Sequence, residues 1–259
     1  MNMIVCVKQV IDPETPAAAF KIDPEAKRAV PPKDKPLVIS PFDENAVEAA
    51  LRVKDAHGGK ITVLSMGGGS AKEVIKHSLA MGGDEGVLLT DPSFDDSDSF
   101  ATAAALAEAI KKIGEYDLIF CGRQEADWDA GQVGCGIAEL LGIPSVTPIK
   151  KIDIKDGKAV VERVVADGYE VVEVSLPALF TVSNELGEPR YATLKGIMAA
   201  AKKQVTNWNA QDVGAAPAKS KMLKLFIPVH EAKCEFIEGK TPEEAGAALA
   251  SRLREAKLI

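Results

Sequence analysis

Alternating strand and helix patterns in the first half of this 259-residue chain most constrain its fold. Short apolar runs, typical of buried strands, occur at 3–10, 60–66, 86–90 and 118–121. An amphipathic helical pattern follows each run, and we expect the four helices to end near Ala56, Met81, Ile113 and Leu141. This regular order predicts an α/β protein with a doubly wound, mostly parallel sheet and helices on both of its faces.

After Pro144 the pattern changes to that of antiparallel strands. Three β-rich stretches, separated by Asp-Gly hairpin signals, lie at 146–155, 158–165 and 169–174. We expect them to form an antiparallel β appendage on the sheet. Residues 178–182 predict one more buried strand.

The remaining segments predict a division of the chain into two parts. We expect an α/β domain over residues 1–205 and a C-terminal arm over residues 206–259. The arm begins irregularly, and the capping-box sequence Thr241–Glu244 then predicts a helix to about Arg254. Near the N-terminus, the Pro-rich segment 12–36 is expected to form a long excursion with a short strand at 20–22.

Segment 117–141 has the strand–loop–helix pattern of a ligand site at the carboxyl edge of an α/β sheet. Its helix is expected to start near Ala130 with Asp129 as N-cap. The free backbone N–H groups of a helix start attract anions, and Gly131 and Gly134 would let a phosphate approach. This pattern favours a sheet of the adenine-nucleotide-binding type.

The alternative for the same segment is an ordinary turn, with glycines for tight packing and Asp129 as a cap. Asp127 and Asp129 would repel a bare phosphate, so we expect them to cap the helix or bind sugar hydroxyls. A second glycine loop, at 67–69, precedes a Ser70–Glu73 capping box, but it lacks the GxxxxGK[ST] pattern of a phosphate-binding loop.

Composition excludes several classes of function. A net charge of −7 argues against nucleic acid as a partner. The four cysteines form no CxxC pair and no histidine accompanies a cysteine cluster, so we expect no metal site. No signal peptide or 18-residue apolar run is visible, and we expect a cytoplasmic protein without membrane insertion. No catalytic set of Ser, His and Asp is found either.

Six stretches, taken in order, resemble the beta subunit of electron transfer flavoproteins over essentially the whole chain. They are Ile4–Asp12, Ser40–Phe42, Ser65–Gly86, Cys121–Gly134, 161–181 and Pro189–Lys203. The resemblance implies a heterodimer whose alpha subunit holds an electron-carrying FAD in a mobile domain. It also implies an adenine nucleotide in this subunit: AMP in the housekeeping kind, or a second FAD that oxidises NADH in the electron-bifurcating kind.

The resemblance also assigns roles to residues. Nucleotide contacts fall by position on Cys6, Lys8, Ser40, Met66, Gly67, Gly122, Asp127, Gln132, Val133 and Gly134. Phe42 resembles the aromatic residue near the alpha-subunit flavin. A partner-recognition loop near 184–203 would dock an acyl-CoA-type or other flavin dehydrogenase through Leu194, flanked by Tyr191 and Ile197, and the electrons would pass to a quinone reductase or another acceptor. The arm would pack on the alpha subunit.

Departures from the family patterns leave the nucleotide open. Val133 fits the bifurcating pattern, whereas Trp128 replaces its small glycine and Ala130-Gly131 replaces its Thr-Ala. A bulky indole would either block an isoalloxazine ring or lie at the surface or subunit interface. Two functions of other classes are an ATP-using enzyme and an AMP-sensing module. The first would need a Gly/Ser-rich turn after the first strand, and residues 8–13 contain none.

Overall fold

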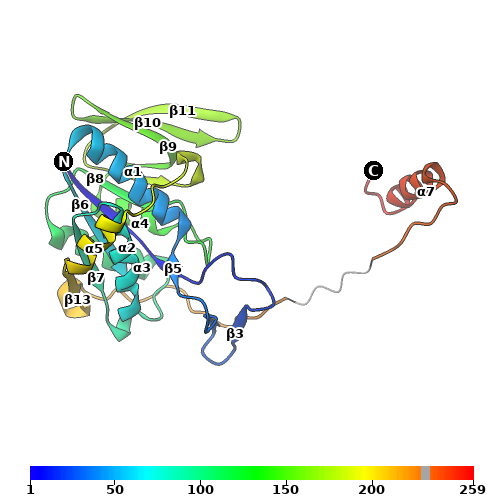
Figure 1. Cartoon of the computed structure of the whole chain (residues 1–259), viewed down its shortest axis with the longest axis horizontal. Coiled ribbons are helices and arrows are strands. Elements are labelled where there is room, and N and C mark those ends of the chain that lie inside the picture. The colour runs from blue at the N-terminus through cyan, green and yellow to red at the C-terminus, as the bar shows by residue number, and fades with distance from the viewer. Residues whose placement is uncertain (229–233) are drawn as a thin grey trace. The chain divides into compact units, whose positions relative to one another are not determined.

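The computed structural model of the chain describes residues 1–228 and 234–259, so His230 and part of the irregular segment 208–240 lie outside it (Figure 1). The chain divides into two compact units, Met1–Lys224 and Leu225–Ile259. This boundary lies later in the chain than the expected one after residue 205. Residues beyond 205 belong to the first unit because Val205–Trp208 forms a strand of its sheet.

Among the described residues, nine strands form one sheet in the order β11-β10-β9-β12-β8-β1-β6-β7-β13. Every neighbouring pair from β9 to β13 in this order is parallel, and β9, β10 and β11 pair antiparallel. The strands are β1 Asn2–Cys6, β6 Lys60–Met66, β7 Glu85–Leu89, β8 Leu118–Gly122, β9 Ser145–Lys155, β10 Lys158–Val165, β11 Gly168–Ser175, β12 Ala178–Val182 and β13 Val205–Trp208. The predicted mostly parallel sheet and its antiparallel appendage are confirmed.

Helices cover both faces of this sheet. The main helices of the first unit are α1 Pro41–His57, α2 Lys72–Met81, α3 Ser99–Ile113, α4 Val133–Leu141 and α5 Leu194–Lys202. Buried side chains of α1, α2 and α5 join one apolar cluster, and those of α3 and α4 join a second. Asp98 caps α3 by accepting from the backbone N–H of Ala101 at 2.9 Å, and Phe100 in the first turn of this helix is exposed.

The first apolar run forms a shorter strand than expected. β1 ends at Cys6, and Gln9–Val10 (β2) instead pairs antiparallel with Val38–Ile39 (β5). Between the two strands, the backbone N–H of Lys8 donates to a side chain of α1, at 2.8 Å. The excursion that follows contains a small hairpin, β3 Lys21–Asp23 and β4 Arg28–Val30.

The second unit contains helix α7, Pro242–Glu255. Thr241 accepts a hydrogen bond from the Glu244 backbone N–H at 3.2 Å, but the Glu244 carboxylate accepts from Lys240, so the predicted capping box is only half formed. None of the side chains of α7 is buried. Among the described residues, no helix has the length and apolar character needed to cross a membrane.

Candidate functional site

The candidate site lies where β1 and β8 end side by side in the sheet. The next two strands of this part of the sheet, β6 and then β7, lie on one side of β1. After α3 the chain crosses to the other side of β1 and forms β8 there. The direction of winding reverses between β1 and β8, and ligands of open α/β sheets bind at the carboxyl ends of such a strand pair.

The carboxylate of Asp43, at the start of α1, connects these two strand ends. One of its oxygens accepts from the backbone N–H of Lys8 at 2.8 Å, and the other accepts from that of Gly122 at 3.0 Å. Burial raises the pKa of Asp43 to about 7, against the opposing effect of the two hydrogen bonds. Sequence reasoning missed this residue, because an acid in the first turn of a helix is common for local reasons.

There is no room for a side chain at position 122, because α1 begins directly against Gly122. A Cβ atom at this position would lie 2.4 Å from Asp43 Oδ1 and 2.9 Å from the Phe42 backbone carbonyl carbon. Such distances are far shorter than any van der Waals contact, so a larger residue would separate α1 from β8. Gly122 therefore positions Phe42 and Asp43 at the edge of the sheet.

An ion pair crosses the top of the same strand pair. Lys8 Nζ lies 2.7 Å from Asp127 Oδ1 and 2.9 Å from Oδ2. The pair ties the loop after β8 to the end of β1. The sequence alone suggested that Asp127 would repel a phosphate. With Lys8 beside it, the Asp127 carboxylate repels a nearby phosphate less than an unpaired carboxylate would.

The helix after β8, α4, starts later than the predicted position near Ala130. The helix begins at Val133, after Gln132, and no side chain caps it. Asp129 is not its cap: this residue has a left-handed backbone, φ 52°, and accepts from Gln124 Nε2 at 2.8 Å. The uncapped N–H groups at the start of α4 are therefore left for a ligand or for water.

Gly134 lies where α4 packs closely on the sheet. The residue is buried, and a Cβ atom on it would lie 3.0 Å from Thr181 Cγ2 and 3.4 Å from Cys121 Cβ. A side chain at this position would therefore push α4 away from the sheet.

Two buried polar atoms near this edge have no hydrogen-bond partner among the described residues. They are Ser40 Oγ, on a fully buried residue, and Arg123 Nε. The Arg123 guanidinium also lies 5.5 Å from the centre of the Phe42 ring. Buried polar atoms are nearly always paired in native proteins, so these two fit contacts to a polar ligand. Sequence reasoning did not single out Arg123.

A second loop at the same edge follows β6. Met66 and Gly67 are half-buried there, and a Cβ atom on Gly68 or Gly69 would meet nothing within 4 Å. The predicted capping box is wrong, because the Ser70 hydroxyl donates to Gln9 Oε1 at 2.7 Å and the cap position of α2 carries no side-chain hydrogen bond. This bond holds the loop against β2 and leaves its glycines open.

The predicted contact Cys6 is a buried thiol at the end of β1. It neighbours Cys121 of β8, where a hydrogen bond with Cys6 and burial raise the pKa of the Cys121 thiol. The Cys121 thiol is therefore neutral, and both buried cysteines pack as small apolar side chains. Among the described residues, no group of three side chains of metal-ligating type comes together.

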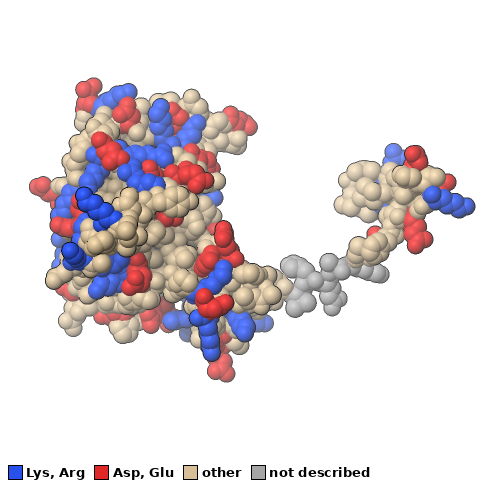
Figure 2. Space-filling view, in the orientation of Figure 1, with Lys and Arg blue, Asp and Glu red and all other residues tan. Residues whose placement is uncertain are grey.

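The three predicted docking residues lie apart from this edge, on and just before α5. Tyr191, Leu194 and Ile197 are all exposed, with 91%, 75% and 51% of their surface accessible. Met198, which sequence reasoning did not name, is exposed beside them on the same helix. Lysines and arginines are interspersed with acids over the visible face of the larger unit, without a continuous field of one sign (Figure 2).

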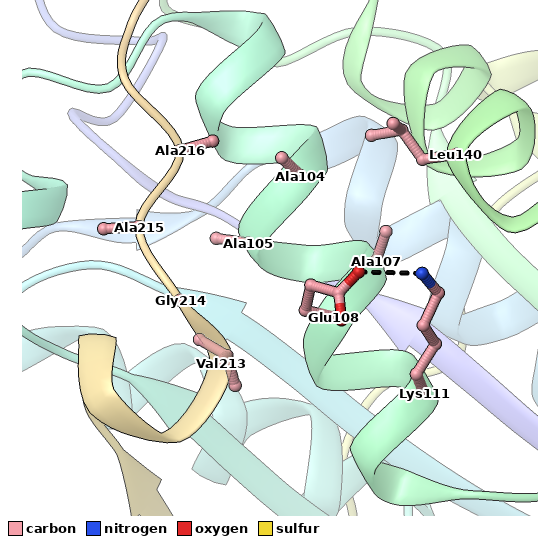
Figure 3. A pocket seen from close by; sticks show the side chains of 10 residues that line it. All are labelled: Ala104, Ala105, Ala107, Glu108, Lys111, Leu140, Val213, Gly214, Ala215 and Ala216. Atoms are coloured by element: carbon pink, nitrogen blue, oxygen red, sulfur yellow. Dashed lines mark hydrogen bonds and ion pairs between the residues drawn. The ribbon is translucent and has the colours of Figure 1, made fainter.

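A hollow of about 310 Å³ lies elsewhere, between α3, α4 and the segment after α6 (Ala210–Val213), as Figure 3 shows. Its walls are mainly alanines, with one ion pair between Glu108 and Lys111 at 2.7 Å. None of the candidate site residues lines it. A surface so poor in polar groups is unsuited to phosphates or ribose.

Comparison with known proteins agrees with the fold. The electron transfer flavoprotein domain model matches residues 32–213. The chain is 41% identical over the full length of both chains to the caffeyl-CoA reductase-Etf complex subunit CarD of Acetobacterium woodii. It is 42% identical, again over both full lengths, to the electron transfer flavoprotein subunit beta of Thermoanaerobacterium thermosaccharolyticum. The acryloyl-CoA reductase electron transfer subunit gamma of Anaerotignum propionicum is 36% identical, with 94% of this chain and 95% of that protein covered.

With these full-length relatives and the nucleotide-binding type of sheet, the chain belongs to the electron transfer flavoprotein family and is related to its beta subunits.

Proposed function

We propose that this chain is the beta subunit of a heterodimeric electron transfer flavoprotein, with AMP bound at the ends of β1 and β8. The FAD that carries the electrons would be held mainly by the alpha subunit. Electrons would come from a docked dehydrogenase and leave to a quinone reductase or another acceptor, in the cytoplasm. The chain's own contribution would be binding and orientation, because the flavin supplies the redox chemistry.

The observation that carries the nucleotide proposal is the buried Ser40 hydroxyl, which has no hydrogen-bond partner in the part of the chain that the structure describes. Ser40 lies in the chain just before α1, and its backbone N–H donates to the Lys8 carbonyl oxygen at 2.9 Å, so its position is tied to the end of β1. Ribose and phosphate oxygens are suitable partners for a hydroxyl group. The Lys8–Asp127 pair, the uncapped start of α4 and the open glycines after β6 would complete the site.

A second FAD in place of AMP is favoured by one observation. The Trp128 side chain, which could block an isoalloxazine ring, is half exposed in the loop before α4 and belongs to neither apolar cluster. A half-exposed indole outside both apolar clusters is held less firmly than a core side chain, which lowers the cost of moving it. This chain would then take part in oxidation of NADH with bifurcation of the electron pair.

The names of the relatives support an acyl-CoA-type partner. Two relatives are named for complexes with reductases of CoA thioesters, caffeyl-CoA and acryloyl-CoA. Leu194 would act as the apolar anchor of such a complex, flanked by Tyr191 and Ile197, because one buried anchor can supply much of the affinity of a transient interface. The C-terminal arm would pack on the alpha subunit.

Counting cofactors in the purified heterodimer tests the proposal. We expect one FAD and one AMP per heterodimer, with flavin measured by absorbance after denaturation and AMP by chromatography. Two FAD and no AMP would establish the bifurcating alternative instead. A colourless preparation, with this chain purified alone and no flavin-bearing second subunit, would overturn the electron-carrier proposal and favour the AMP-sensing module.

A further inference from the structure

The docking helix α5 cannot stabilise itself. It is nine residues long, and Ala200 is its one buried residue. Isolated helices of this length are marginal in water, so contacts from elsewhere must hold it in place. Its start is capped locally, where the Thr193 hydroxyl accepts from the Gly196 backbone N–H at 3.0 Å. Its other end has no local cap of this kind.

The carbonyl groups at the end of α5 are satisfied by a lysine from another helix. Lys76 of α2 donates from Nζ to the backbone oxygens of Ala200 at 2.7 Å, of Ala201 at 3.1 Å and of Lys203. Ala200 and Ala201 lie in the last turn, where carbonyls lack a full set of intrahelical partners and a positive charge is favoured. The Ala200 oxygen also accepts from the backbone N–H of Lys203 at 3.1 Å. The residue after α5 is extended, with ψ 136°, so a left-handed glycine cap is absent.

The capping is reciprocal between α2 and α5. Lys203, directly after α5, donates from Nζ to the backbone oxygen of Gly83 at 2.6 Å, just beyond the end of α2. In the middle of the contact the two backbones nearly touch, since a Cβ atom on Gly196 would lie 2.3 Å from the Ala80 backbone oxygen. The position of α5 is therefore set by α2 at three points.

We propose that Lys76 is a positioning residue for partner docking, which fixes the end of α5 so that Leu194, Ile197 and Met198 are presented in one arrangement. This inference rests on the proposed docking role of α5. A surface that is already ordered before binding does not lose conformational freedom when the partner arrives. Lys76 itself is half-buried and its ammonium is directed at carbonyl groups of its own chain, so it acts through α5.

The test compares three variants in the complete heterodimer. Lys76→Met keeps the length of the side chain and removes the cap, and Lys76→Arg restores donors. Lys72→Met is the matched control, because Lys72 is an exposed lysine one turn earlier on α2 whose side chain makes no hydrogen bond or ion pair among the described residues. Hydrogen exchange over residues 191–203 reports the order of α5 without any partner.

Docking is measured with a flavin-dependent acyl-CoA dehydrogenase that reduces the unchanged heterodimer, with the heterodimer as the varied substrate. For Lys76→Met we expect exchange over 191–203 to rise at least tenfold and KM to rise about threefold to tenfold, with kcat within twofold. Lys76→Arg should bring the exchange rate and the KM most of the way back to those of the unchanged protein. Lys72→Met should alter neither the exchange rate nor the KM.

Three results separate this inference from the proposed function. Unchanged exchange over 191–203 in Lys76→Met would overturn the positioning role, even where Leu194→Ala raises KM. Faster exchange with an unchanged KM would also overturn it, because the order of α5 would then not matter for docking. An unchanged KM in Leu194→Ala would overturn the docking role of α5 itself.

Discussion

At the scale of single residues, Asp43 has the most consequences for the site. Its carboxylate ties the chain just after β1, at Lys8, to the last residue of β8, Gly122, at the point where the nucleotide is proposed to bind. A buried carboxylate is costly in its charged form, and burial accordingly raises its pKa to about 7. The stability of the fold should therefore depend on the protonation state of this one side chain.

The Asp43→Asn variant tests that dependence. Between about pH 4 and about pH 7 the folded protein holds a proton on Asp43 that the unfolded chain releases, so this residue's contribution to stability falls as the pH rises. We expect the unfolding free energy of the natural protein, minus that of Asp43→Asn, to decrease over this range. Urea unfolding at several pH values measures it, with the exposed Asp95→Asn as control. A difference that stays flat with pH would contradict the prediction.

Leu194 belongs to the same scale. With 75% of its surface exposed at the start of α5, its side chain contributes little to the core. We expect Leu194→Ala to raise the KM of the dehydrogenase for the heterodimer about tenfold, while the flavin content and the melting temperature stay the same. The size follows from losing a buried apolar anchor at an interface, which costs about 1–3 kcal/mol. Val171→Ala, at an exposed position on β11, is the control.

At the scale of elements, the segment before α5 is held against α1 by a buried carboxylate. Glu48 of α1 accepts from Arg190 Nε at 2.7 Å and from Arg52 Nε at 2.9 Å, and Arg52 also donates to the Leu186 backbone oxygen at 2.8 Å. Burial opposes the ionisation of Glu48, but the hydrogen bonds from Arg190 and Arg52 outweigh it and hold its pKa below the ordinary value. Both ends of the docking segment are thus fixed to helices of the main fold.

Glu48→Gln should loosen this attachment. We expect Glu48→Gln to lower the unfolding free energy by about 1–3 kcal/mol at pH 7. This is less than for a fully buried ion pair, because Arg190 is one-third exposed and water screens its charge. Because the folded pKa is lowered, the loss should be full at neutral pH and shrink as the pH falls below 4.5. Urea unfolding at pH 7 and pH 4 checks both parts, with the exposed Glu139→Gln as control. An equal loss at the two pH values would count against the charge as its source.

At the scale of the whole molecule, the two units differ in how they are stabilised. Both apolar clusters lie within Met1–Lys224, with residues from the strands and from the helices that cover the sheet. Helix α7 of the second unit buries none of its side chains, and Leu249 is among its exposed apolar residues. A helix with so little burial gains little stability from its own chain. This agrees with the proposal that the alpha subunit covers it.

Deleting residues 225–259 tests that proposal. We expect the melting temperature of the remaining chain to change by less than about 5 °C, because a domain of this size shifts by about 2–4 °C per kcal/mol and no buried cluster is touched. Association with the alpha subunit, measured by co-purification and by analytical ultracentrifugation, should weaken strongly. Full association of the shortened chain would show that the arm is not part of the subunit interface.

The strand and helix patterns were recognisable from the sequence because they depend on local periodicity. Strand β6 at Lys60–Met66, the buried face of α1 and the hairpins of β9 to β11 all follow from residues near one another in the chain. The short edge strand β13 was missed, since half of its residues are exposed and the strand it pairs with, β7, lies more than a hundred residues earlier. Its pairing depends on the tertiary fold.

What the sequence by itself determined is the family, the doubly wound sheet and the segments that meet at its carboxyl edge. Only the tertiary structure decided what the individual side chains do there. It placed Asp43 between two backbone N–H groups, paired Lys8 with Asp127, moved the start of α4 to Val133 and capped α5 with Lys76. The physical reason is the same in each case: a polar side chain bonds whichever donor or acceptor folding brings within reach, and these partners are distant in sequence.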